Sequence, residues 1–289
     1  MKAQKNRLYK DVEVLSGIRP YRNYQNLASL KYAANYIRTE FEATGFICEE
    51  QEWIAKGRKY KNIIASWNPQ KQKRLIVGAH YDVAGDQPGA DDNASGIAGL
   101  LETARLIAEN KPDLDYRIDF VAYCLEEPPF FGDNEMGSYI HAKSLKNSNA
   151  EILGMICYEM IGYFSDKENS QPNPIPELAQ NFPTVGNFIM VVGIKDYKDF
   201  NNKVHRLMSE NSGIDTQVIS LPANSSLAGL SDQRNYWKFG YNALMITDTA
   251  TVRNAGNYHY STDTIETLNF DKMTEVINSS YNAIIGFQK

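Results

Sequence analysis

Residues 74–105 read RLIVGAHYDVAGDQPGADDNASGIAGLLETAR, and this stretch decides the fold. The apolar run LIVGA, residues 75–79, predicts a buried strand. A loop with glycine and proline follows, and residues 95–110 carry apolar side chains at helical spacing. Imidazole and carboxylate groups lie where the strand ends and the helix begins, which is where sites form in α/β proteins. We therefore expect an α/β fold with a polar site at this edge of the sheet.

Strands and helices alternate on both sides of this stretch. Apolar runs predict further strands at residues 46–54, 61–67, 116–125, 152–158, 187–192, 216–221 and 241–247. Helical spacing predicts helices at residues 26–44, 138–145, 197–212, 231–239 and 270–287. The first strand alternates in polarity and is expected near an edge, while the polar, proline-rich residues 165–186 are expected outside the core. The pattern predicts a three-layer αβα sandwich around a central mixed, largely parallel sheet, as a single domain over residues 1–289.

Composition excludes several classes of protein. The 289 residues are 43% hydrophobic and 22% charged, as in an ordinary globular protein, and the net charge of −5 argues against nucleic acid or anionic membrane as a partner. No window approaches the ~18 consecutive apolar residues of a membrane span. The first residues lack the apolar core of a signal peptide, a pattern shared by cytoplasmic proteins and by exported ones whose signal has been removed. The three cysteines form no CxxC pair and no disulfide framework.

Metal-competent side chains follow the ends of several predicted strands. Because parallel strands bring their carboxyl ends to one edge of the sheet, groups far apart in the chain can converge there. A carboxylate at the end of a buried strand is costly unless it is paired or bound to a cation. Imidazole with carboxylate is the ligand set of zinc and similar divalent metals. The candidates are His80, Asp82, Asp91, Asp92, Glu126, Glu127, Glu159 and His259.

These residues fall in five short blocks that resemble a known family. The blocks are HYD at 80–82, GADDNASG at 89–96, EE at 126–127, EMIG at 159–162 and YHYSTDT at 258–264. They resemble, in the same order, the motif blocks of family M28 zinc metallopeptidases, which include secreted bacterial leucine aminopeptidases. The resemblance implies the fold of the zinc-dependent exopeptidases and an aminopeptidase that acts on peptides with a free N-terminus.

The resemblance also implies a role for each matching residue at a site with two zinc ions. Asp92 would be the carboxylate that bridges the two ions. His80 and Glu159 would complete one zinc, and Glu127 and His259 the other.

Two further residues would act around the ions. Asp82 would accept the second N–H of His80 and so fix its tautomer. Glu126 would be the general base that takes a proton from the metal-bridging water and passes it to the leaving amine. An extended backbone would point Glu126 and Glu127 to opposite sides, which suits two different roles. Asp91 is interpreted as a charge at a helix N-terminus, where Asn93 and Ser95 are candidate caps.

The chain departs from the family pattern in two places. Many members have aspartate where Glu159 stands, and many reach Gly-Ser soon after the second glutamate. Here residues 128–136 form a longer aromatic loop beside the expected general base, so the substrate preference of the best-known members is not transferred to this chain. The candidates for a substrate pocket are Met160, Tyr163, Phe130, Phe131 and Tyr236, and ordinary packing is the alternative for each.

Four other polar residues lie outside the proposed ligand set. His141 and His205 are interpreted as surface residues. Asp248 and Asp263 are candidates for supporting the metal ligands, with structural pairing as the alternative.

Three other interpretations remain. A glutaminyl cyclase uses one zinc on a similar fold, but the cyclases resemble ATDSA where this chain has GADDNASG. A deacylase or carboxypeptidase of the M20 type would need an inserted lid domain, and a binding protein without activity would not need the complete ligand set. The sequence leaves open the preferred N-terminal residue, the native metal, whether one or two metals are occupied, and the oligomeric state.

Overall fold

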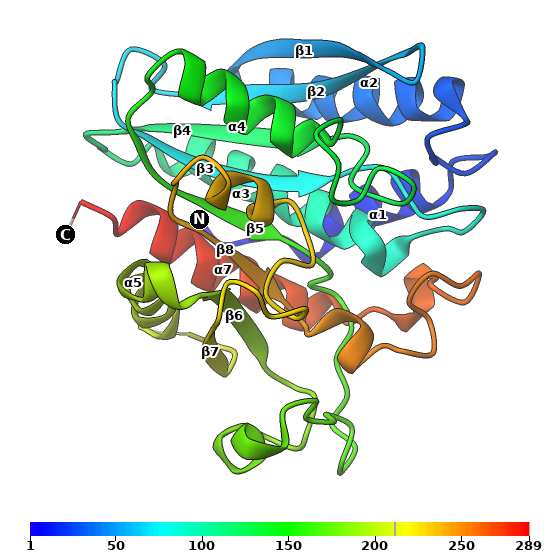
Figure 1. Ribbon diagram of the computed structural model, residues 1–289, viewed down its shortest axis with the longest axis vertical. Coiled ribbons are helices and arrows are strands. Elements are labelled where there is room, and N and C mark those ends of the chain that lie inside the picture. Colours follow the sequence, from blue (N-terminus) through cyan, green and yellow to red (C-terminus); the bar gives the residue numbers. More distant parts are fainter. Residues whose placement is uncertain (211, 289) are drawn as a thin grey trace.

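A computed structural model describes residues 1–210 and 212–288. That part of the chain contains an eight-stranded sheet with the order β1-β2-β4-β3-β5-β8-β6-β7 (Figure 1). The strands are β1 (Ile47–Ala55), β2 (Arg58–Trp67), β3 (Arg74–His80), β4 (Arg117–Tyr123), β5 (Ile152–Tyr158), β6 (Ile189–Ile194), β7 (Thr216–Leu221) and β8 (Ala243–Thr247). The predicted edge position of the first strand is confirmed.

The sheet is mixed, as predicted, with a parallel centre. β3 pairs in parallel with β4 and β5, and β5 pairs in parallel with β8. The antiparallel pairs are β1 with β2, β2 with β4, and β6 with β8. The carboxyl ends of β3, β4 and β5 therefore lie side by side at one edge of the sheet.

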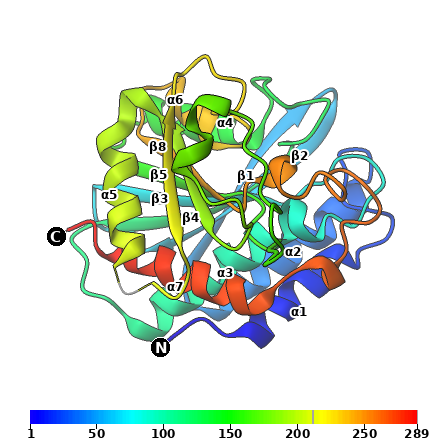
Figure 2. The ribbon, with the colours of Figure 1, turned by 90° about the horizontal axis from the view of Figure 1, so that it is seen from below.

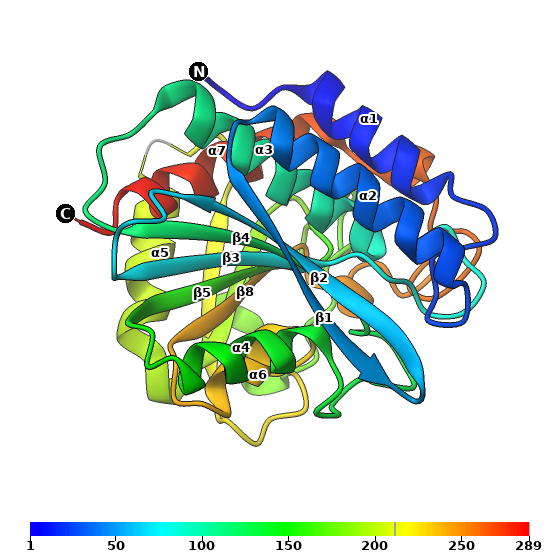
Figure 3. The ribbon, with the colours of Figure 1, turned by 90° about the horizontal axis from the view of Figure 1, so that it is seen from above.

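Helices cover both faces of the sheet (Figure 2 and Figure 3). One layer contains α1 (Lys5–Ser16), α2 (Leu27–Ala43), α3 (Gly96–Asn110), α5 (Lys198–Ser209) and α7 (Phe270–Ile285). The other contains α4 (Gly137–Asn147) and α6 (Gln233–Trp237). Buried apolar side chains form one cluster on each side of the sheet, so the αβα sandwich is confirmed.

Helix α3 is the most enclosed of the helices, because α1, α2 and α7 all pack against it. The apolar side chains at helical spacing in α3 are buried, as predicted, and most of its other residues are buried too. Helix α1, which the sequence did not predict, is tied to α3 by ion pairs between Arg7 and Glu102 at 2.6 Å and between Arg105 and Asp11 at 2.6 Å. This layer supports the start of α3, where the predicted site lies.

The 165–186 segment leaves the sheet between β5 and β6, as predicted, and extends below it in Figure 1. Gln171 ties it to the loop after β8, donating to Thr249 Oγ1 at 3.0 Å and accepting from Arg253 Nε at 2.7 Å. A cavity of about 100 Å³ lies between this segment and the sheet. Among the described residues, no helix has the length and apolarity that a membrane crossing requires.

Candidate metal centre

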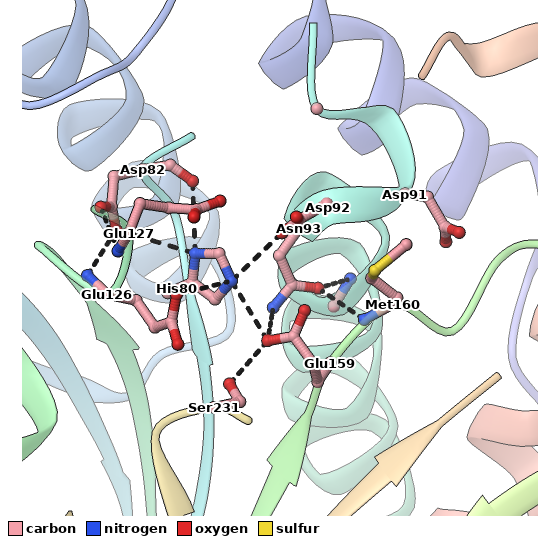
Figure 4. A network of polar contacts seen from close by, with 12 residues as sticks. His80, Asp82, Asp91, Asp92, Asn93, Glu126, Glu127, Glu159, Met160 and Ser231 are labelled. Carbon is pink, nitrogen blue, oxygen red and sulfur yellow. Dashed lines mark hydrogen bonds and ion pairs between the residues drawn. The ribbon is translucent and has the colours of Figure 1, made fainter. Parts of the chain in front are cut away.

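The predicted polar side chains meet at the carboxyl edge of the central strands (Figure 4). His80 is the last residue of β3, and Glu159 directly follows β5. Glu126 and Glu127 follow β4 after a short extension, and Asp92 lies in the turn that leads into α3. The residues directly before this edge are apolar or aromatic in β3, β4 and β5, and the charged groups follow them.

One group consists of His80, Asp92 and Glu159. The Nε2 atom of His80 lies 3.1 Å from Glu159 Oε2 and 3.4 Å from Asp92 Oδ1. All three side chains are buried. Their potential ligand atoms lie within 4.8 Å of one another, which is close enough to share one metal ion.

A second group consists of Asp92, Glu127 and His259. The Nε2 atom of His259 lies 3.1 Å from Asp92 Oδ2 and 3.2 Å from Glu127 Oε2. His259 comes from the loop before α7 and is the most exposed of the three. Asp92 thus presents one carboxylate oxygen to each group, and the two groups share it.

The chemistry of these groups fits a divalent metal. Among the described residues, Glu126 Oε1 and Glu127 Oε1 are buried without a hydrogen-bond partner, and His259 Nε2 faces Asp92 and Glu127 without the geometry of a hydrogen bond. Burial, followed by the neighbouring charge of Asp92, raises the pKa of Glu127 to about 8. Buried carboxylates in such proximity are unfavourable unless a cation compensates them, and imidazole nitrogen with carboxylate oxygen is a zinc ligand set.

Asp263 supports the backbone that carries Asp92. Its two carboxylate oxygens accept the backbone N–H groups of Asp91, at 2.9 Å, and Asp92, at 3.0 Å. The Asp91 carboxylate points away from His80 (Figure 4) and accepts from the backbone N–H of Gly162 at 3.0 Å and from Asn254 at 2.9 Å. Asp91 is therefore outside both ligand groups and holds the segment after β5 against the start of α3.

Asn93 joins α3 to the end of β5. Its side-chain oxygen accepts from the backbone N–H groups of Gly96, at 3.0 Å, and Met160, at 3.1 Å. Its amide donates to the carbonyl of Tyr158 at 2.9 Å. Asn93 thus accepts the first N–H of α3, as predicted for a cap, and also positions the backbone on both sides of Glu159. The predicted capping role of Ser95 is wrong, because its hydroxyl donates to the carbonyl of Asp91.

Asp82 holds the two glutamates in place. Its carboxylate oxygens accept the backbone N–H groups of Glu126 and Glu127, each at 3.2 Å. His80 Nδ1 lies 3.2 Å from the backbone carbonyl of Asp82 and 3.7 Å from its carboxylate. The expected contact between the carboxylate and His80 is thus longer than a hydrogen bond, because the carboxylate is engaged by the glutamate backbone.

Ser231 is a site residue that the sequence did not reveal. Its hydroxyl donates to Glu159 Oε2 at 2.6 Å, the same oxygen that faces His80. The contact joins residues 72 positions apart in the chain. Ser231 lies in a loop whose sequence has no spacing typical of metal ligands. Only the fold brings Ser231 to the end of β5.

Two of the suggested pocket residues belong to the core. Phe130 is fully buried and packs edge-on against Tyr24, with ring centroids 5.5 Å apart. Tyr236 is also fully buried, and its hydroxyl forms hydrogen bonds of 2.6 Å with His141 and with Tyr123. The prediction that His141 is a surface residue is wrong, since it lies on the buried side of α4 and is only 3% exposed.

The apolar cavity lies elsewhere, beneath the 165–186 segment. Its walls come from that segment, from β6, β7 and β8, and from the loop before α6. Leu230 lines the cavity, while the next residue, Ser231, bonds to Glu159. None of the proposed ligands lines the cavity, and the Leu230–Ser231 peptide is its link to the first ligand group.

Comparison with known proteins identifies relatives along the whole chain. The profile of peptidase family M28 matches residues 62–283. The protein YfbL of Escherichia coli K12 is 40% identical over 287 residues, covering 96% of this chain and 86% of YfbL. A probable leucine aminopeptidase of Arthroderma otae is 24% identical over 287 residues, covering 94% of this chain and 69% of the relative.

Solved structures share the fold. The LapA aminopeptidase of Legionella pneumophila superposes with a TM-score of 0.78 at 18% identity, covering 99% of this chain and 73% of LapA. The glutaminyl cyclase of Fimbriiglobus ruber superposes with a TM-score of 0.73 at 19% identity, covering 100% of this chain and 97% of the cyclase. At such identities these likenesses concern the fold alone. The family profile and the E. coli relative decide the family: the chain belongs to peptidase family M28, whose members are metallopeptidases.

Proposed function

We propose that the protein is an aminopeptidase that binds two zinc ions and removes the N-terminal residue of peptides. The observation that carries the proposal is the placement of Asp92, whose two oxygens lie 3.4 Å from His80 Nε2 and 3.1 Å from His259 Nε2. A carboxylate shared in this way suits two adjacent ions. The relatives named as aminopeptidases support the same reaction class.

Five side chains would hold the ions. His80 and Glu159 would bind one ion, Glu127 and His259 the other, and Asp92 both. A bound divalent ion supplies Lewis acidity, which polarises a peptide carbonyl and lowers the pKa of water. The chain's contribution is to fix these ligands, through Asp82, Asp263, Asn93 and Ser231.

Glu126 would move the proton. Its Oε2 lies 3.9 Å from His80 Nε2, at the edge of the first ligand group, and its Oε1 has no partner among the described residues. A buried carboxylate with a free oxygen at this position can accept a proton from the attacking water and deliver it to the leaving amine. Asp82 fixes the Glu126 backbone and so the reach of its side chain.

The cavity would receive the side chain of the N-terminal residue. Met190, Met245 and Ile219 contribute to its apolar walls, and Leu230 lines it one residue before Ser231, which bonds to Glu159. A cavity of this kind favours apolar side chains because each buried CH₂ contributes about 0.8 kcal/mol. We therefore propose leucine-like N-terminal residues as preferred substrates.

Hydrolysis of a panel of aminoacyl-p-nitroanilides tests the proposal. We expect release of p-nitroaniline that is fastest for leucine, slower for alanine and slowest for glutamate, that stops with a chelator and that returns with added zinc. Absence of chelator-sensitive release across the panel would falsify the proposed activity.

The second candidate is a glutaminyl cyclase with one zinc. The cyclase of F. ruber matches this chain over 97% of its own length, so the fold is compatible with both reactions. The position of Asp92 between His80 and His259 favours the peptidase. One zinc per chain, together with cyclisation of a peptide that begins with glutamine, would decide for the cyclase.

A further inference from the structure

Arg22 is a buried arginine in the turn between α1 and α2, outside the residues that match the family profile. Its exposed fraction is 1%. The guanidinium donates four hydrogen bonds, all to backbone carbonyls. Such a group offers five N–H donors in a rigid plane, so it can fix several chain segments relative to one another.

Three of the four carbonyls belong to the loop that connects two proposed ligands. Nε donates to Tyr81 at 2.8 Å, Nη1 to Pro88 at 2.6 Å and Nη2 to Gly89 at 2.7 Å. Tyr81 directly follows His80, and Gly89 lies three residues before Asp92. The guanidinium therefore links the two ends of this loop.

Neighbouring contacts hold the rest of the same loop. The carbonyl of Arg22 accepts the N–H of Val83 at 3.3 Å, and Asn23 donates to the carbonyl of Gly85 at 2.8 Å. A Cβ at Gly89 would lie 2.3 Å from the carbonyl of Asp92 and 3.2 Å from Nη2 of Arg22. The loop is thus packed tightly around the guanidinium.

The charge of Arg22 also faces the site. No described carboxylate forms an ion pair with it, in contrast to Arg7 and Arg105. Burial lowers the pKa of Arg22 to about 10, and the charges of nearby carboxylates, first among them Asp263 and Asp92, oppose this shift. The guanidinium therefore remains charged at neutral pH, and its counter-charges are carboxylates of the metal centre.

We propose that Arg22 is a positioning residue that holds His80 and Asp92 at the spacing required for metal binding before an ion arrives. The inference rests on the proposed function for the ligand roles of His80 and Asp92. It assigns a part of the site to the N-terminal segment, which supplies none of the proposed ligands.

Zinc affinity of an Arg22→Met variant tests this inference. The variant keeps the length of the side chain but removes every donor and the charge. Competition with a chromophoric chelator should reveal zinc binding weakened by about 10- to 100-fold, the usual cost of losing a group that orients metal ligands. Arg22→Lys retains the charge and some donors, so it should recover part of the loss and serves as the variant of choice if Arg22→Met does not fold.

Arg105→Met is the matched control. It removes a guanidinium of the same helical layer that bonds to Asp11 and Glu40 and not to the loop. Its zinc affinity should stay within about twofold of the wild type, whatever its thermal stability. Equal zinc affinity in Arg22→Met and wild type, or equal weakening in both arginine variants, would overturn the inference.

Hydrogen exchange of the metal-free protein separates this inference from the proposed function. Arg22→Met should speed exchange of backbone amides in residues 80–92, and Arg105→Met should not. Unchanged exchange in that loop would contradict the role of Arg22 even if zinc binds. A wild-type protein that binds no zinc would instead contradict the proposed function, while the exchange result would still decide whether Arg22 holds the loop.

Discussion

Glu126 and Glu127 are adjacent in the chain but have different surroundings. Glu127 Oε2 lies 3.2 Å from His259 Nε2, whereas Glu126 Oε2 faces the other histidine, at the longer distance of 3.9 Å from His80 Nε2. We predict that Glu126→Gln lowers kcat by about 10²- to 10⁴-fold, the usual contribution of a general base, and leaves zinc content unchanged. Steady-state kinetics with a leucine anilide and metal analysis of the same sample measure both quantities.

Two further glutamate variants make this prediction specific. Glu127→Gln should lose zinc as well as activity, because it removes a proposed ligand. Glu135→Gln changes a partly exposed residue of the neighbouring loop and should retain both. If Glu126→Gln kept its kcat, Glu126 would not be the base.

His141 should make stability depend on pH. Burial lowers its pKa from 6.5 to about 4, so the folded protein keeps it neutral while the unfolded chain binds a proton below pH 6.5. Because the unfolded state then holds more protons, this stability is complete above pH 6.5 and is lost as the pH falls toward 4, by about 3 kcal/mol in total. Urea unfolding between pH 4 and 7 measures the slope.

The matched comparison for this effect is His205. It is partly exposed on α5, with Nε2 2.8 Å from the carbonyl of Thr216. His141→Gln should flatten the dependence of unfolding free energy on pH, and His205→Gln should leave it as in the wild type. Identical slopes in all three proteins would show that His141 is not held neutral.

At the level of residues, the sequence predicted the groups that strands carry and missed those that only packing brings in. His80, Glu126 and Glu159 follow apolar runs, and the rule for parallel strands placed them at one edge. Ser231 and Arg22 reach the site from loops without periodicity, across 72 and 59 residues of chain. No local pattern marks such contacts, because they depend on how loops pack over the sheet.

At the level of elements, strand β7 should influence which substrates are preferred, because it forms part of the cavity wall. Ile219 lines the cavity, whereas its neighbour Val218 packs on the other face of the sheet, in the layer that contains α5. We predict that Ile219→Trp lowers kcat/KM for the leucine anilide by about tenfold more than for the alanine anilide, since the indole takes the space of the larger substrate. Kinetics with both anilides provide the ratio.

Val218→Trp is the control for this change. Both positions are half-buried on the edge strand β7, but their side chains point to opposite faces. Val218→Trp should keep the wild-type ratio of leucine to alanine. An unchanged ratio in Ile219→Trp would mean that the cavity does not receive the N-terminal side chain.

The bounds of the strands were easier to predict from the sequence than the cavity beneath the 165–186 segment. The observed bounds of β5 and β7, Ile152–Tyr158 and Thr216–Leu221, are those predicted from the sequence. Helix α1 escaped prediction because its buried stripe is short and mixed with charged residues that pair with α3. The cavity escaped it as well, since its walls combine the irregular 165–186 segment with three strands of the sheet.

At the level of the whole molecule, we propose that residues 1–289 form one domain. The proposed ligands come from segments between His80 and His259, so metal binding should stabilise the fold as a unit. We predict a single thermal transition, coincident by tryptophan fluorescence and far-UV circular dichroism. Zinc at 100 times its dissociation constant should add about 2.7 kcal/mol to the free energy of unfolding for each occupied site.

Two histidine variants test the link between metal and fold. His259→Ala should reduce the stabilisation by zinc, and His205→Ala should preserve it. Separate transitions by the two probes would argue against one domain, and equal stabilisation of both variants would argue against His259 as a ligand.

Anomalous diffraction at the zinc absorption edge, from crystals of the zinc-loaded protein, tests the central claim most directly. The account predicts two peaks, one among His80, Asp92 and Glu159 and the other among Asp92, Glu127 and His259. A single peak, or peaks away from Asp92, would contradict it.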